Sequence, residues 1–128
     1  MVGNLVLRLE NNADIMQSIK DFAIENKIKS GFFVSARGSI KNFELMVNGS
    51  RALLNKQKHD GIFDVNSVSG KIQLINNQVN VGLRVSVSST GFTSQSGQLI
   101  NGKAANFLEF ELKDFNDSKM IIAWNNHF

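Results

Sequence analysis

Hydrophobic and polar residues alternate most regularly over residues 79–88. The apolar positions of this stretch are Val79, Val81, Leu83, Val85 and Val87. Because the side chains of a β-strand alternate between its two faces, this pattern predicts a strand with one face in the core and one face outside. Asn76 and Asn77 precede the strand, and asparagine tolerates the positive φ angles of a tight hairpin turn.

A second pattern has the period of an α-helix and begins after the first predicted strand. Its apolar positions are Ile15, Ile19, Phe22 and Ala23. They recur at spacings of four, seven and eight residues from Ile15, which brings them to one helical face. Asn12 is the expected N-cap, and Asp14 suits the positive end of the helix dipole in the first turn. We therefore expect one helix with this face in the core.

The remaining strands are shorter or less regular. They are expected at residues 4–9, 32–36, 43–47, 61–65, 68–75, 95–100, 107–112 and 120–124. Gly38 and Asn42 are expected to bend the chain between two of them, Asn101 and Gly102 to form another turn, and residues 49–60 to form an exposed loop. This order predicts an α+β fold, with a strongly curved, mainly antiparallel, open-barrel-like sheet and one principal helix packed on it.

Composition is that of a single globular domain spanning residues 1–128, with 42% hydrophobic and 20% charged residues. The chain has no cysteine, which excludes disulfides and thiolate metal sites. It has no apolar run long enough for a membrane helix and no signal-peptide pattern at its start. We therefore expect a cytoplasmic protein that does not enter membranes.

Basic residues concentrate in one quarter of the chain. Residues 27–58 hold seven lysines and arginines and a single acid, Glu44, a net charge of +6 in a chain whose total is +3. Such a surface can bind nucleic acid through its phosphates. The candidates for phosphate contact are Lys41, Arg51, Lys56 and Lys58. A merely solvated face is the alternative, and Lys27 and Lys29 already suit the C-terminal end of the helix dipole.

Motifs of catalysis are missing from the sequence. No Gly-rich phosphate loop and no Gly-x-Ser-x-Gly elbow occurs. The two histidines, His59 and His127, cannot supply a multi-histidine metal site, and His59 is expected to be a solvated loop residue. Glu109 and Glu111 share one strand face, which is more typical of a solvated surface than of paired-acid catalysis. We expect no catalytic residue, no cofactor and no enzymatic activity.

Several short stretches resemble a known family in their order and spacing. They are Leu7-Arg8-Leu9-Glu10, the helix through Asn26, residues 31–40 with Arg37-Gly38-Ser39, residues 61–65, Ser69-Gly70-Lys71-Ile72, Ser96-Gly97-Gln98-Leu99 and residues 102–109. Together they resemble the plant and prokaryote conserved (PPC) domain, also called domain of unknown function 296. The resemblance implies a curved-sheet α+β fold, a homotrimer, and a role in DNA binding or transcriptional regulation.

The same resemblance implies a difference at one site. Many prokaryotic members carry His-x-His in a strand and a third histidine farther on, a pattern similar to a zinc site. Here Gly82, Arg84 and Gln98 take those positions, and none of them is a suitable zinc ligand, so we expect the site to be free of metal. Arg84 is instead expected to pair with Glu109 or Glu111, or to bind a small anion.

Three kinds of function therefore remain open. The first is a DNA-binding module that contacts the phosphate backbone, since Arg37-Gly38-Ser39 lacks the second arginine and the proline of an AT-hook. The second is a protein-interaction module that uses residues 61–66, in which Phe63 more often belongs to a core. The third is a small-molecule sensor or enzyme that uses the pocket around Gly82, Arg84 and Gln98, the vestigial metal site whose positions, with Glu109, are candidates for binding a small anion.

Overall fold

The computed structural model describes residues 3–48, 54–89, 91 and 93–115. Within these ranges the chain forms one helix and six strands. In chain order the elements are β1 (Gly3–Glu10), α1 (Ile15–Glu25), β2 (Ser30–Asn48), β3 (Leu54–His59), β4 (Phe63–Ile75), β5 (Gln78–Ser88) and β6 (Ser94–Asp114). This confirms the predicted α+β class.

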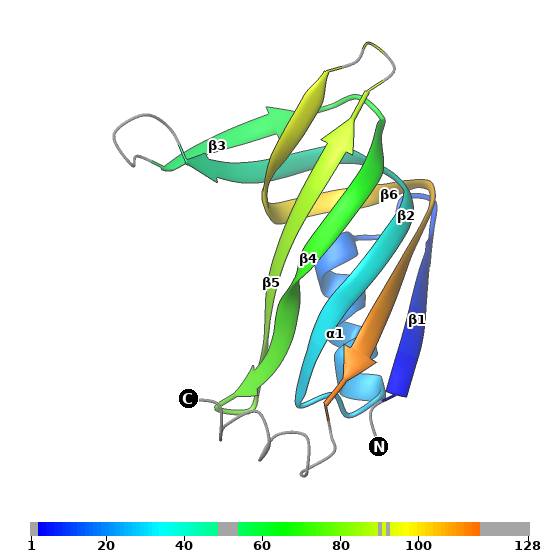
Figure 1. Cartoon of the computed structure of the whole chain (residues 1–128), viewed down its shortest axis with the longest axis vertical. Helices are drawn as coiled ribbons and strands as arrows, with labels where there is room; N and C mark the ends of the chain where they lie inside the picture. The colour runs from blue at the N-terminus through cyan, green and yellow to red at the C-terminus, as the bar shows by residue number, and fades with distance from the viewer. Residues whose placement is uncertain (1–2, 49–53, 90, 92, 116–128) are drawn as a thin grey trace.

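The six strands form one antiparallel sheet that curves into a ring without closing as a regular barrel (Figure 1). Its strand order is β1-β6-β5-β4-β2-β3, and β6 also pairs with β2. The C-terminal half of β6 lies between β1 and β2, whereas its N-terminal half lies between β5 and β2. Helix α1 packs on the inner side of the curve against β1, β5 and β6.

Two strands are longer than the sequence pattern predicts. The strands expected at 32–36 and 43–47 are one strand, because β2 runs for 19 residues through Gly38 and Asn42. Both residues have positive φ and lie at register shifts, so the chain bends there without leaving the sheet. The expected turn at Asn101 and Gly102 is wrong, because β6 runs through it for 21 residues. β-bulges between β2 and β6 explain both results, since an extra residue lets a strand curve while it stays paired.

The predicted loop at residues 49–60 contains a strand, β3, so this expectation is corrected. β3 pairs only with β2 and is therefore an edge of the sheet. All four residues from Asn55 to Lys58 are exposed, on both faces of the strand. Because neither face of β3 is buried, its sequence has no alternation of apolar and polar residues. The periodicity of the sequence therefore does not predict this strand. Arg51 and the strand expected at 120–124 lie outside the described residues.

Helix α1 begins two residues later than predicted. Asp14 is the N-cap, and its Oδ1 accepts a hydrogen bond from the Gln17 backbone N–H at 3.0 Å. Asn12 instead has φ of 74° in the preceding turn, and its N–H donates to the Ala104 carbonyl at 2.9 Å. The predicted apolar face is confirmed, with Ile15 and Ile19 fully buried.

The core fills the inside of the ring. The alternation of residues 79–88 is confirmed, since Leu83, Val85 and Val87 are buried while the residues between them face outward. Phe63 is also buried, as expected. His59 corrects a prediction, because its ring stacks on Phe43 at a centroid distance of 5.1 Å instead of lying in solvent. No helix in the described ranges has the length and apolar character needed to cross a membrane.

Candidate anion-binding face

Strand register brings two of the predicted site groups onto one surface. Gln98 of β6 lies directly opposite Arg84 of β5 on one side and opposite Met46 of β2 on the other. The register continues outward from Arg84 to Ser69 of β4 and from Met46 to Lys56 of β3. Because directly opposed residues point to the same face, these five residues form one line across five strands, here called the cross-strand row.

The cross-strand row lies on the outer face of the ring, because the alternate residues Leu83 and Val85 fill the core. Neighbouring strands are about 4.8 Å apart, which separates Arg84 from Lys56 by roughly 14 Å along the sheet. Lys58 shares a face of β3 with Lys56, since the two are two residues apart in an extended strand. The row and Lys58 contribute three cations to this surface.

Arg84 borders a shallow depression of about 190 Å³. The residues that line it are Ser67, Val68, Ser69, Arg84, Val85, Ser86 and Ser96. The lining contains no carboxylate. Arg84 is exposed, and its guanidinium has no hydrogen bond or ion pair with another described residue. A cation surrounded by hydroxyl groups is therefore open to an external anion.

Gly82 supplies free space next to this depression. It faces the same side of β5 as Arg84, two residues away, and lies opposite Lys71 of β4. A Cβ atom at Gly82 would meet nothing within 4 Å. Three of the four predicted pocket positions, Gly82, Arg84 and Gln98, are thus neighbours on one face.

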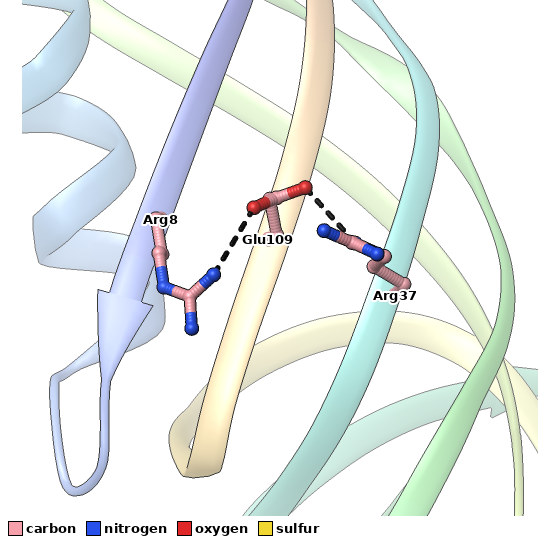
Figure 2. Close-up of polar contacts among 3 residues, drawn as sticks. All are labelled: Arg8, Arg37 and Glu109. Atoms are coloured by element: carbon pink, nitrogen blue, oxygen red, sulfur yellow. Dashed lines mark hydrogen bonds and ion pairs between the residues drawn. The ribbon is translucent and has the colours of Figure 1, made fainter.

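The fourth position, Glu109, belongs to a different cluster (Figure 2). It lies in the C-terminal half of β6, opposite Arg8 of β1 and Arg37 of β2. Its Oε1 accepts a hydrogen bond from Arg37 Nε at 3.0 Å, and its Oε2 lies 3.5 Å from a terminal guanidinium nitrogen of Arg8. The Arg8 guanidinium also stacks over the Phe107 ring at 4.8 Å. We call Arg8, Glu109 and Arg37 the arginine–glutamate triad.

The triad corrects the expectation that Arg84 pairs with Glu109, and it also replaces the interpretation of Glu109 as a merely solvated residue. Glu111, the other expected partner, lies opposite Val6 and Ser35. Sequence reasoning missed the triad, although Arg8, Arg37 and Glu109 each occur in stretches that carry the family resemblance. Only the register of three strands reveals that these residues meet.

The predicted basic candidates separate in the structure. Lys56 and Lys58 join the outer face described above. Lys41 lies apart from them, opposite Lys103, and its Nζ donates to Asn11 Oδ1 at 3.2 Å. Arg51 lies outside the described residues. The candidate face is therefore defined by Arg84, Lys56 and Lys58, and Lys41 does not extend it.

The residues at the positions where the family resemblance implied a zinc site do not fit a zinc ion. Gly82 has no ligand atom, the Arg84 guanidinium stays protonated, and the Gln98 amide is a poor donor for zinc. Within the described ranges, no three His, Asp or Glu side chains gather into a group that could hold a metal ion.

An antiparallel ring of strands around one helix defines a small α+β domain. The model of the Plants and Prokaryotes Conserved (PCC) domain matches residues 2–116, and the chain belongs to this family. The family resemblance seen in the sequence is thereby confirmed. No curated protein sequence matches the chain.

Solved structures share this fold at low sequence identity. A plant- and prokaryote-conserved protein from Pyrococcus horikoshii superposes with a TM-score of 0.78 at 18% identity, covering 89% of this chain and 80% of its own. A protein from Bacteroides thetaiotaomicron named as a candidate DNA-binding protein gives 0.80 at 19% identity, with coverage of 89% and 80%. A metal-containing protein from Archaeoglobus fulgidus gives 0.78 at 19% identity, with coverage of 89% and 81%.

Proposed function

We propose that this protein is a non-enzymatic module that binds nucleic acid through its phosphate backbone. The observation that carries the proposal is the outer face with Arg84, Lys56 and Lys58, whose cross-strand row contains no acid. One carboxylate borders this face: Glu44 lies opposite Lys58 and accepts a hydrogen bond from Asn101 at 2.8 Å. Names of two relatives in fold, from Bacteroides thetaiotaomicron and Ralstonia eutropha, describe candidate DNA-binding proteins, which is consistent with this function.

Phosphate contacts supply affinity without reading base sequence. The outer face offers point charges on an exposed sheet, and none of its cations comes from a helix that could enter a major groove. We therefore propose binding that tolerates sequence and depends strongly on salt. Two or three phosphate contacts per chain correspond to a slope of about −2 to −3 for the logarithm of affinity against the logarithm of salt concentration.

The test is fluorescence anisotropy with a labelled DNA duplex at several salt concentrations. Replacing Lys56 and Lys58 together by glutamine should weaken binding and make the slope less steep by about 2. Lys29→Gln is the control, because it removes an exposed charge just before β2, away from the row. A flat salt response of the unmodified protein, or equal effects of the control and the double variant, would contradict the proposal.

The family resemblance also leads us to propose a homotrimer, in which the outer face would occur three times. Light scattering on the purified protein tests this directly, with three times the chain mass as the expected result. A monomer mass at working concentration would reject the trimer and leave the backbone-binding proposal to the anisotropy experiment.

A protein-interaction module that uses residues 61–66 is the alternative. It has less support because Phe63 is buried and Ile62, 55% exposed, is the large apolar side chain that this stretch leaves accessible. Capture of a protein partner that persists after nuclease treatment and is lost in Ile62→Ser would favour the alternative over nucleic-acid binding.

A further inference from the structure

The depression beside Arg84 is rich in hydrogen-bond donors that have no internal use. Ser67 of β4, Ser86 of β5 and Ser96 of β6 are directly opposite one another, in a row parallel to the cross-strand row. With Ser69 they bring four hydroxyl groups around the guanidinium. None of these four hydroxyls has a side-chain hydrogen bond to another described residue. Each can therefore donate to a ligand.

A second cation stands near the open space. Lys71 is exposed and lies diagonally across from Arg84, because it is opposite Gly82. Diagonal neighbours on adjacent strands are about 7–8 Å apart, within reach of long side chains. The missing side chain of Gly82 leaves the space between the two cations clear. Arg84 thus lies between the serine-lined depression on one side and the Gly82 space with Lys71 on the other. The long side chains of Arg84 and Lys71 are within reach of one small ligand placed beside Ser69.

This combination discriminates between kinds of anion. A phosphodiester carries one charge and two free oxygens, and a carboxylate likewise offers two oxygens. A phosphomonoester carries about −1.5 to −2 charges at pH 7 and three acceptor oxygens. Two cations flanked by several hydroxyls match the larger charge and the greater number of acceptors.

We propose that this depression is a seat for the terminal phosphate of a phosphomonoester, bound by Arg84, Lys71 and the surrounding serines. The phosphate can belong to a free mononucleotide or to the 5′ end of a nucleic-acid strand. The second source rests on the proposed function, whereas the first does not. The inference goes beyond the proposed function, because binding to the phosphate backbone of a nucleic acid does not require a terminal phosphate.

The primary experiment is a titration followed by NMR amide shifts, with inorganic phosphate, adenosine 5′-monophosphate and adenosine as probes. Both phosphates should shift the amides of residues 67–71, 82–86 and 96–98, and adenosine should not. Arg84→Gln should weaken the response to adenosine 5′-monophosphate at least tenfold. Gly82→Glu should remove it, since the new carboxylate would lie between the two cations. Both positions are exposed, so the fold should tolerate either change.

The control variant is Arg37→Gln, which removes an exposed arginine that Glu109 already engages. It should leave the titration unchanged. The proposed phosphate site would be contradicted if Arg37→Gln and Arg84→Gln weakened binding of adenosine 5′-monophosphate equally. It would also be contradicted if phosphate shifted the amides of all basic residues. A protein that fails to bind duplex but keeps localised, Arg84-dependent shifts would reject the proposed function and retain this inference.

Oligonucleotides with and without a 5′ phosphate distinguish the two sources of the phosphate. A single-stranded oligonucleotide with a 5′ phosphate should bind several-fold more tightly than the same strand with a 5′ hydroxyl if strand ends are the ligand. Equal affinities, combined with an intact response to adenosine 5′-monophosphate, identify a free mononucleotide. If neither the phosphorylated strand nor the mononucleotide responds through Arg84, the inference is wrong.

Discussion

The two halves of β6 present the same arrangement with opposite electrostatic results. In the N-terminal half, Gln98 lies opposite Arg84, and in the C-terminal half Glu109 lies opposite Arg8 and Arg37. All of these side chains are on the outer face of the ring. The carboxylate engages both of its arginines, whereas Arg84 has no ion pair among the described residues. Whether an exposed arginine forms an ion pair within the sheet thus depends on the residue one strand away.

The backbones of the two regions are more alike than their charges. Each contains a glycine with positive φ beside the polar cluster, Gly38 next to Arg37 and Gly70 next to Ser69. A Cβ atom at Gly38 would collide with the Phe107 carbonyl oxygen, and one at Gly70 with the Gly82 carbonyl oxygen. Close approach of paired strands therefore supports both regions, while their charged side chains are arranged differently.

Gly70→Ala should have the largest effect on stability, because it disturbs the close pairing of β4 and β5 next to Arg84. The substitution adds backbone strain at φ of 137° and a clash with β5, so the free energy of unfolding should fall by about 3 kcal/mol. Urea denaturation followed by circular dichroism measures the change. An unfolding midpoint equal to that of the unmodified protein would show that the two strands can separate here at no cost.

Gln98→Glu should give Arg84 a carboxylate partner like the one that Arg8 and Arg37 share in the triad. A carboxylate directly opposite Arg84 competes with external anions, so affinity for adenosine 5′-monophosphate should fall about tenfold, the equivalent of about 1.4 kcal/mol. Calorimetric titration measures the affinity, and Gln98→Asn serves as the uncharged control. If both substitutions weaken binding alike, the amide of Gln98 acts as a ligand and charge is not the cause.

Glu109→Gln is the reverse change and releases Arg8 and Arg37. Affinity for a DNA duplex should rise about threefold, with a salt slope steeper by about 0.9 if one released arginine gains a phosphate contact. Stability should fall by about 1 kcal/mol or less, because exposed ion pairs contribute little. The anisotropy assay and urea denaturation give the two values. An unchanged affinity would mean that Arg8 and Arg37 remain held without their carboxylate, for instance by the Phe107 ring.

Much of this fold is predictable from local patterns, whereas the contacts across strands are not. Residues 79–88 and the helical face of Ile15 and Ile19 were predictable, because each buries one regular face. The predicted hairpin turn is also present, with φ of 52° at Asn76 and 64° at Asn77. The proximity of Arg84 to Gln98 followed from the family resemblance. In each of these cases the information lies in adjacent residues or in a motif.

Other features depend on register, which local sequence does not contain. Bulges hide the continuity of β2 and β6, and β3 buries neither face. In the triad, Glu109 is 101 residues from Arg8 and 72 from Arg37 along the chain. A shift of one residue in the pairing of β6 with β1 or with β2 would move a side chain of the triad to the opposite face. Spacing along the sequence therefore could not predict that the three residues meet. The Arg84 depression was missed in part for the same reason, since its serines come from three strands.

Gly82→Ala should have the smallest effect and gives the sharpest comparison with Gly70→Ala. The two glycines lie on neighbouring strands, but Gly82 has open space over it, and no positive φ strains an added methyl group. Alanine restricts the unfolded chain more than glycine does, so stability should rise by roughly 0.5 kcal/mol. Urea denaturation of the two variants side by side measures the difference. A loss of stability at Gly82 comparable to that at Gly70 would mean that something covers this face in solution, and a trimer contact would then be the first explanation to test.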